Sequence, residues 1–158
     1  MTDEKITQYD VSIPKEEHGS LTWEEHKMPA YCSVNKALAH FKHKEVFGWH
    51  LAIVIECEAQ LTTGQPTPEE KEIVDKFCGA LVTKLTEENN ALFLAKSTWN
   101  GCYNLFLRVY DPYVADDYLK SVLEQETNPR EMEYHMEQDK EWKFAQHYIK
   151  PFEKTDIM

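Results

Sequence analysis

The sequence predicts an α+β sandwich in which two helices pack on one face of an antiparallel sheet. Three observations support this prediction. Residues 49–58 read as a buried strand, residues 67–85 and 111–123 each carry apolar side chains at helical spacing, and Asn100-Gly101 marks a tight hairpin between two further strands. The resulting order, strand, helix, strand, strand, helix, strand, is that of a ferredoxin-like βαββαβ domain with a four-stranded sheet.

Domain boundaries follow from composition along the chain. Residues 1–20 are polar and show no sustained apolar periodicity, so we expect an N-terminal arm. A single α+β domain is expected over residues 21–152, because a chain of this length can bury one sizeable core. Residues 153–158 are expected to form a C-terminal tail.

A hairpin is expected to precede the βαββαβ unit. Residues 21–26 and 30–35 can pair, with Lys27-Met28-Pro29 as the turn. This placement keeps Pro29, which has no N–H donor, out of the ladder. Residues 37–47 fit either a helical turn or a loop.

The first strand and the first helix of the unit have clear signals. Residues 49–58 alternate two sets that are both mostly apolar, which predicts a central strand covered on both faces. A helix is expected to start at Thr67 because Thr67 can cap it, Pro68 suits its first turn and Glu70 can complete a capping box. Its apolar residues form a stripe that should lie on the sheet: Ile73, Val74, Phe77, Cys78, Leu81, Val82 and Leu85.

The central hairpin, residues 90–112, is expected to supply the next two strands. Its second arm alternates between two faces, one with Tyr103, Leu105, Leu107 and Val109, the other with Asn104, Phe106, Arg108 and Tyr110. Asp111-Pro112 predicts the start of the second helix, and Asn128-Pro129 predicts its end. Trp99, Phe106 and Tyr110 are either exposed aromatics on the second sheet face or core residues beneath an added segment.

The C-terminal part is expected to add an edge strand and a short helix. Residues 130–138 alternate apolar with charged side chains, and such charges protect a sheet edge from further pairing. Asp139 can cap a helix that contains Trp142 and Ile149. Trp142 is expected to anchor the core.

Composition narrows the classes of partner. The chain has 28 acidic and 17 basic residues, a formal charge of −11, which disfavours nucleic acids and anionic membranes and favours a basic protein partner. We expect a cytoplasmic protein, because no signal peptide and no apolar run near the ~20 residues of a membrane span is present. The four dispersed cysteines are expected to be reduced thiols.

The usual sequence patterns of enzymes and cofactor sites are missing. There is no Gly-x-Ser-x-Gly, no phosphate-binding glycine loop and no cysteine in basic surroundings, so no cofactor is expected. His40-x-x-His43 could place two imidazoles on one helical face, but Lys42 lies between them and we expect surface histidines. Glu56 and Glu58 could form a carboxylate pair; we expect solvated charges at a strand end.

Several segments together resemble a bacterial protein family. These are Trp23 with residues 29–35, the hairpin 97–106, and Asp139-x-Glu141-Trp142 with its downstream tyrosine and proline. They resemble the domain-of-unknown-function 695 (DUF695) family, which implies a small ferredoxin-like α+β fold and no established activity. Members often have a basic residue shortly after the hairpin glycine, where this chain has Tyr103. A distant likeness to the protein regulator of ribonuclease E is also present.

Two functional hypotheses follow. The first is a non-enzymatic regulatory module that occludes a basic partner such as a nucleic-acid enzyme, as inhibitors and immunity proteins do. Its candidate partner-binding residues are Trp99, Tyr103, Glu131, Glu133 and Glu137. The second is a small-molecule-binding protein or enzyme with a pocket between the sheet and the C-terminal segment. The candidate pocket residues are Trp142, His147 and Tyr148.

Overall fold

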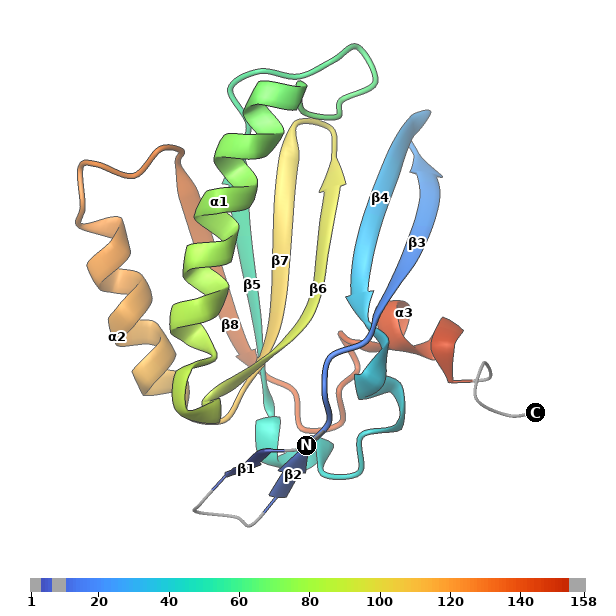
Figure 1. The fold of residues 1–158 in the computed structure, drawn as a ribbon, viewed down its shortest axis with the longest axis vertical. Coiled ribbons are helices and arrows are strands. Elements are labelled where there is room, and N and C mark those ends of the chain that lie inside the picture. Colours follow the sequence, from blue (N-terminus) through green and yellow to red (C-terminus); the bar gives the residue numbers. More distant parts are fainter. Residues whose placement is uncertain (1–3, 7–10, 154–158) are drawn as a thin grey trace.

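The computed structural model describes residues 4–6 and 11–153 and confirms the α+β prediction. Figure 1 shows one large antiparallel sheet with two long helices side by side on one face. The sheet has six strands in the order β3-β4-β6-β7-β5-β8. Their bounds are β3 (His18–Glu25), β4 (Met28–Asn35), β5 (Trp49–Glu56), β6 (Ala91–Trp99), β7 (Cys102–Val109) and β8 (Met132–Gln138).

The remaining elements are helices and one small hairpin. The helices are α1 (Pro68–Leu85), α2 (Pro112–Leu123) and the short α3 (Gln146–Ile149). Short 3-10 turns are η1 (Lys36–His40), η2 (Lys44–Phe47), η3 (Glu87–Asn89) and η4 (Lys150–Phe152). A separate two-stranded pair, β1 (Glu4–Ile6) and β2 (Val11–Ile13), lies in the expected N-terminal arm. Residues 1–3 and 7–10 of this arm and residues 154–158 of the expected tail lie outside the described part of the chain.

The ferredoxin-like unit runs from β5 to β8. Its strands are ordered β6-β7-β5-β8, so β5 and β7, the first and third strands of the unit, are central as the apolar pattern predicted. β8 is an edge strand, and the N-terminal hairpin pairs through β4 with β6 at the other side of the unit. The hairpin therefore widens the sheet beyond the two helices.

The turn of this hairpin differs from the prediction. His26 and Lys27 both have positive φ, 52° and 65°, and form a two-residue turn. Turns of this kind match the right-handed twist of the flanking strands and are therefore favoured in hairpins. Met28 consequently begins β4, and Pro29 lies inside the ladder opposite Glu24. Pairing of β4 with β6 starts beyond the proline, at Tyr31.

The start of α1 is capped as predicted, but by one group instead of two. Thr67 accepts a hydrogen bond from the Glu70 backbone N–H at 3.3 Å. The Glu70 carboxylate does not complete the capping box, because it accepts from the Glu58 N–H at 2.6 Å and from Arg130 Nε at 2.7 Å. The hydrogen bond from Arg130 lowers the pKa of Glu70 to about 2. This contact joins α1 to the loop before β8. Ile73, expected in the buried stripe, is exposed.

Core residues occupy both faces of the sheet. On the helix side, α1 and α2 pack on Leu51, Ile53, Leu105 and Leu107. On the opposite side, the C-terminal segment packs on the sheet and buries Trp142, Ala145 and Ile149. Of the two alternatives for the second face, the covered one is correct for Phe106 and Tyr110, which pack against this second core.

A buried ion pair attaches the C-terminal segment. Arg108 of β7 donates from Nη1 to Asp139 Oδ2 at 3.0 Å and from Nη2 to the Asp139 carbonyl at 2.5 Å. Its guanidinium also lies 4.6 Å from the centre of the Trp142 ring. Asp139 accepts from the Lys143 and Phe144 backbone N–H groups, as a capping residue does. The predicted helix nevertheless begins later, at Gln146, because Trp142 adopts a positive φ of 58° that interrupts helical geometry.

The buried His50 should make the stability of this network depend on pH. His50 is 8% exposed, accepts from Arg108 Nη1 at 3.2 Å, and stacks between Phe106 and Phe144. Burial, and then the Arg108 charge, lower its pKa from 6.5 to about 4. Between these values the unfolded chain binds more protons than the folded one. The contribution of His50 to the free energy of unfolding should therefore fall by about 3 kcal/mol as the pH drops from 6.5 to 4.

The matched test is His50→Gln, which keeps an acceptor for Arg108 but does not titrate. Urea unfolding between pH 7 and pH 4, tested with about half a pH unit between points, should give a flatter profile for this variant than for the wild type. The exposed His135 lies on the same sheet face and is the smallest of the causes that shift the pKa of His50, so His135→Gln should keep most of the wild-type slope. Equal slopes for wild type and His50→Gln would contradict this assignment.

Candidate functional site

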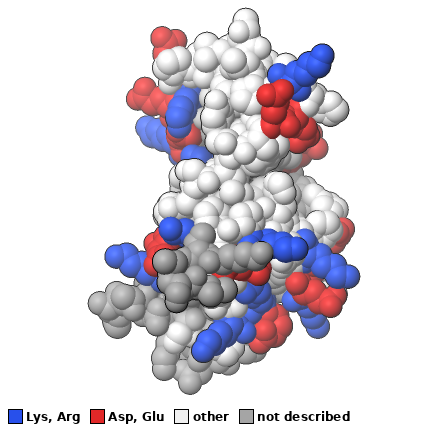
Figure 2. Space-filling view, turned by 90° about the vertical axis from the view of Figure 1, so that its right-hand side faces the viewer, with Lys and Arg blue, Asp and Glu red and all other residues white. Residues whose placement is uncertain are grey.

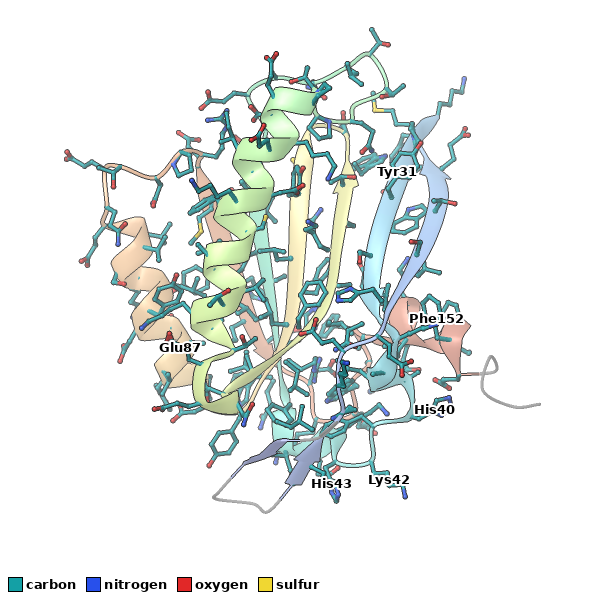
Figure 3. All side chains as sticks on the ribbon, viewed as in Figure 1. Tyr31, His40, Lys42, His43, Glu87 and Phe152 are labelled. Carbon is teal, nitrogen blue, oxygen red and sulfur yellow. The ribbon has the colours of Figure 1, made fainter. Side chains whose placement is uncertain are left out.

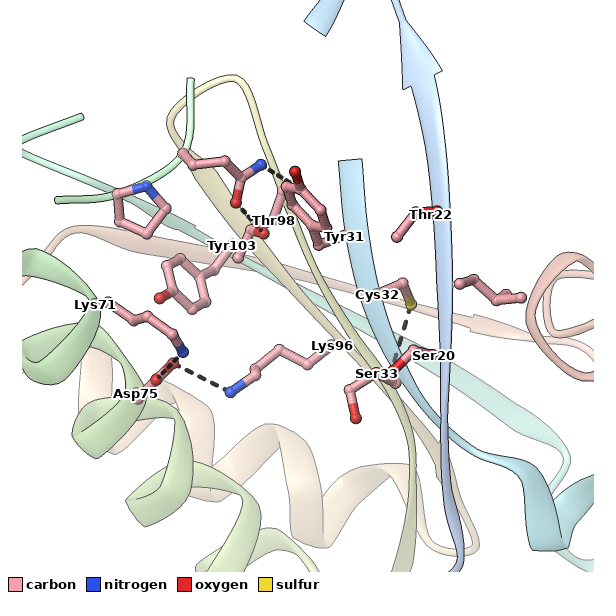
Figure 4. Close-up of a pocket in the computed structure, with 13 residues that line it drawn as sticks. Ser20, Thr22, Tyr31, Cys32, Ser33, Lys71, Asp75, Lys96, Thr98 and Tyr103 are labelled. Atoms are coloured by element: carbon pink, nitrogen blue, oxygen red, sulfur yellow. Dashed lines mark hydrogen bonds and ion pairs between the residues drawn. The ribbon is translucent and has the colours of Figure 1, made fainter. Parts of the chain in front are cut away.

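A pocket of about 540 Å³ opens where the sheet extends beyond the helix layer. One wall is α1, the floor is formed by β6 and β7, and the opposite wall is the β3–β4 hairpin (Figure 4). Figure 3 shows Tyr31 of β4 in the space between the hairpin and the α1 side of the molecule. The pocket therefore exists because six strands are wider than the two helices that cover them.

Strand pairing and helical spacing bring the lining residues together. Cross-strand partners point to the same face of a sheet, and β4 pairs Tyr31 with Thr98 and Ser33 with Lys96 of β6. On α1, Lys71 and Asp75 are one turn apart and share a face. All six residues are polar or charged at their tips, so the pocket joins a hydroxyl-bearing sheet surface to an ion cluster.

The ion cluster consists of one carboxylate between two ammonium groups. Lys71 Nζ lies 2.7 Å from Asp75 Oδ2, and Lys96 Nζ lies 3.1 Å from Asp75 Oδ1. Burial would raise the pKa of Asp75, but the hydrogen bonds from both lysines outweigh burial and lower it. Lys96 Nζ also lies 5.9 Å from the centre of the Tyr103 ring. Asp75 is therefore ionised and holds both lysines at the pocket.

Tyr103 is the unusual residue of this site. The side chain is 1% exposed, and its hydroxyl has no hydrogen-bond partner among the described residues. Figure 4 shows the hydroxyl directed toward Lys71 and Asp75. Burial, and then the charge of Asp75, raise the pKa of Tyr103, although Asp75 lies outside hydrogen-bonding geometry. The hydroxyl therefore stays protonated, as a buried donor without an acceptor, which normally costs about 1–3 kcal/mol.

The loop before α1 closes the upper end of the pocket. Gln65 donates from Nε2 to the carbonyls of Pro29 and Thr98 at 3.0 and 3.1 Å, and accepts from Thr98 Oγ1 at 2.7 Å. The loop is also tied to the central hairpin, because the Gly101 N–H donates to the Gly64 carbonyl at 2.7 Å. The wall is thus formed before any ligand arrives.

A carboxylate, imidazole and hydroxyl form a chain at the pocket rim. His18 Nε2 lies 3.0 Å from Glu16 Oε1, and His18 Nδ1 lies 3.3 Å from Ser33 Oγ. The side chains of Glu16 and His18 are about half exposed, at 49% and 53%. Activated nucleophiles depend on a base held in a water-excluded site, so we assign this chain no catalytic role.

The predicted partner-binding residues do not form one surface. Tyr103 is buried on the helix side of the sheet, so it does not reach a macromolecular partner at the hairpin tip. Trp99 is half-buried at that tip, where its Nε1 donates to the Glu25 carbonyl at 3.0 Å. Glu131, Glu133 and Glu137 are exposed at the other edge of the sheet, in or next to β8. β7 and β5 separate them from Trp99.

The second predicted set, Trp142, His147 and Tyr148, lies in the C-terminal segment. Trp142 is completely buried, and its Nε1 donates to the carbonyls of Lys44 and Phe47. Tyr148 packs on Phe106 with ring centres 4.9 Å apart. His147 is exposed and meets Trp23 edge-on at 5.1 Å. Trp142 is thus part of the second core, and Tyr148 packs against that core.

The predicted histidine pair lies far from the pocket. Figure 3 places His40 and His43 at the end of the molecule opposite Tyr31. Both are exposed, and His43 Nδ1 is 4.0 Å from Glu45 Oε1. Within residues 4–6 and 11–153 no group of three or more histidine, cysteine or acidic side chains is arranged to hold a metal ion.

Sequence reasoning missed Lys71, Asp75, Lys96 and Tyr31 as site residues. One signal was present, since Lys96 is the single charged residue in the otherwise uncharged strand β6 (Ala91–Trp99). A lone charge in an apolar strand needs a partner, and the partner here is on α1. Tyr31 and Asp75 have no comparable signal, because their relation depends on how the hairpin docks.

Removal of the Tyr103 hydroxyl should not destabilise the protein. Tyr103→Phe eliminates an unpartnered buried donor and keeps the ring, so the free energy of unfolding should rise by about 1 kcal/mol. The matched control is Tyr134→Phe, which removes a hydroxyl that donates to Asp116 Oδ1 at 2.5 Å and should lose about 1 kcal/mol. Urea denaturation measures both. Equal losses in the two variants would show that the Tyr103 hydroxyl has a partner.

Comparison with known proteins identifies a family. The model of DUF695, a family of unknown function, matches residues 24–149, which confirms the resemblance in the sequence. No curated protein and no solved structure shows a significant match, so the likeness to the protein regulator of ribonuclease E has no support. In the described part of the chain, no helix is long and apolar enough to cross a membrane.

Proposed function

Because the chain belongs to the DUF695 family, whose function is unknown, we propose from geometry that the domain binds a small polar molecule in the pocket between α1, β6 and the β3–β4 hairpin. The Tyr103 hydroxyl is the observation that carries this proposal. A buried donor without an acceptor is costly, and a ligand that supplies the acceptor would remove the cost. The volume, about 540 Å³, suits one small molecule.

The pocket offers three kinds of contact to such a ligand. Hydroxyl groups of Ser20 and Thr22 can donate to or accept from polar ligand atoms, and Thr98, which donates to Gln65, can still accept. Tyr31, 49% exposed, presents an aromatic surface. Lys71 covers the Tyr103 side with a side chain that is 61% exposed, so it can move aside as a ligand enters. The remaining wall is held by Gln65 and needs no rearrangement.

Binding fits the pocket better than nucleophilic catalysis. Cys32, the one thiol that lines it, is buried, and burial raises its pKa to about 12. The thiol therefore stays protonated at neutral pH, where only the thiolate would be a good nucleophile. The chemistry that remains is recognition by hydrogen bonds, charge and an aromatic ring.

A ligand screen tests this proposal. A library of small polar metabolites should contain members that raise the melting temperature of the full chain and shift amide resonances of residues lining the pocket. Tyr103→Phe should weaken their binding about tenfold, the value of one hydrogen bond of ~1.4 kcal/mol, without loss of stability. Tyr134→Phe is the control and should bind as the wild type does. Ligands that bind elsewhere, or equally to Tyr103→Phe, would contradict the proposal.

A second candidate function is capture of a basic protein by an acidic surface. Glu131, Glu133 and Glu137 favour it, because all three are exposed at one edge of a chain with a formal charge of −11. An acidic surface steers a cationic partner, such as a nucleic-acid enzyme, and can occlude its site. Trp99 lies in β6, which β7 and β5 separate from β8, so it would form a separate contact with the partner. This function does not use the pocket and would coexist with it.

Salt dependence and charge removal test the second function. A pull-down should retain a basic protein at low salt and lose it at high salt, as screening predicts. The triple variant Glu131→Gln, Glu133→Gln and Glu137→Gln should lose the same partner. The control removes equal charge elsewhere, at the exposed Glu24, Glu72 and Glu88, and should retain it. If both variants lose the partner equally, binding depends on the net charge of the protein alone, which would contradict a binding site at β8.

A further inference from the structure

We infer that the pocket ligand carries one anionic group, a carboxylate or a phosphate, which binds at Lys96 beside the Tyr103 hydroxyl. This inference rests on the proposed small-molecule function and specifies its ligand. It follows from the charge of the pocket, from the hydrogen-bond donors of Lys96 and Tyr103, and from the ion pairs that Asp75 forms with both lysines.

The pocket is positive in a protein that is strongly negative. Among the described residues that line it, the charged ones are Lys71, Lys96 and Asp75, which together carry one positive charge, against −11 for the chain. Figure 2 shows that charged side chains on the β3–β4 side gather toward the two ends, with an uncharged band between them. An anion that enters the pocket thus meets a net positive charge from the described lining residues.

Lys96 has donors to offer within the pocket. An ammonium group has three N–H donors, and Asp75 Oδ1 takes one of them at 3.1 Å. Its neighbour on the other side is the Tyr103 ring, 5.9 Å from Nζ, which attracts the charge but accepts no N–H at that distance. The side chain is 29% exposed, so its charge is only partly screened by water. The remaining donors can bind a ligand oxygen.

Tyr103 supplies a second donor near Asp75, the residue to which Lys96 is bound. Each Asp75 oxygen accepts from a lysine, and the Tyr103 hydroxyl has no hydrogen-bond partner among the described residues. A carboxylate or phosphate has more than one oxygen, so one oxygen can accept from Lys96 and another from Tyr103. Hydrogen bonds to an ionised acceptor are about twice as strong as neutral ones, so an anionic oxygen gains most from this pair.

The same cluster disfavours a cationic ligand. Asp75 is the carboxylate that an amine would seek, but it already lies between two ammonium groups. A third positive charge there would be repelled by both lysines. A neutral ligand would satisfy Tyr103 but leave the positive charge of the cluster uncompensated. An anion, in contrast, both accepts a hydrogen bond from Tyr103 and compensates the positive charge of the cluster.

The two lysines should differ in their contribution. Lys71 is 61% exposed and Lys96 is 29% exposed, so charge interactions of Lys71 are more strongly screened. We therefore expect Lys96→Met to weaken anion binding about tenfold or more, and Lys71→Met about twofold to threefold. Lys84→Met is the matched control on α1, since Lys84 pairs with Glu87 outside the pocket and the variant should bind as the wild type does.

The experiment uses matched probes on the isotopically labelled full chain. Benzoate is compared with benzyl alcohol, glucuronate with glucose, and inorganic phosphate is titrated alone, with dissociation constants from amide shifts of pocket residues. In at least one pair the anion should bind about tenfold more tightly than its neutral partner, and added NaCl should weaken the anion alone. Tighter binding of the carboxylates or of phosphate assigns the group, and either result supports the inference.

Two outcomes separate this inference from the function on which it rests. Neutral probes or screen ligands that bind in the pocket as tightly as anions would overturn the anion inference and leave the binding function standing. Absence of pocket binding by every probe and every screen ligand would overturn both. If Lys96→Met does not fold, as judged by circular dichroism, the salt dependence of the wild type decides: unchanged anion affinity between 20 and 300 mM NaCl, about a fourfold change in screening length, would overturn the inference.

Discussion

The buried ion pair between Arg108 and Asp139 is the interaction on which the arrangement of the molecule depends. Arg108 lies in the central strand β7, on the face away from the helices, where an unpaired charge would cost several kcal/mol. The guanidinium donates to the Asp139 carboxylate, the Asp139 backbone carbonyl, the Phe47 carbonyl and His50 Nδ1. The pair therefore requires the C-terminal segment to lie against the sheet, and Trp142 then covers the guanidinium.

With the C-terminal segment in place, some surfaces of the sheet are covered and others are left open. The helices cover one face of the βαββαβ unit, and the C-terminal segment buries part of the other. The β3–β4 hairpin extends the sheet past α1, and the exposed step between hairpin and helix becomes the pocket. The candidate site is thus a product of adding two strands to an otherwise complete unit, which agrees with the tendency of function to lie in additions to a common scaffold.

Two of the polar residues of β7, Arg108 and Tyr103, show how stability and function separate. Arg108 and Tyr103 are both almost fully buried, on opposite faces of one strand. Arg108 is surrounded by acceptors that the chain itself provides, as structural groups usually are. Among the described residues Tyr103 has no acceptor, although Asp75 is close. The chain thus supplies hydrogen-bond acceptors for Arg108 in the core, whereas the Tyr103 hydroxyl lies beside the pocket, where a ligand can supply its acceptor.

Local signals in the sequence determined the elements and their order. Thr67-Pro68, Asp111-Pro112 and Asn100-Gly101 start helices or turns through their own backbone and side-chain chemistry, and strand alternation identified the central strands. Only the tertiary structure decided the hairpin turn at His26-Lys27, the partner of Arg108 and the pocket. These depend on which strand pairs with which, a contact between residues distant in the chain, whereas periodicity reports only the environment of each segment.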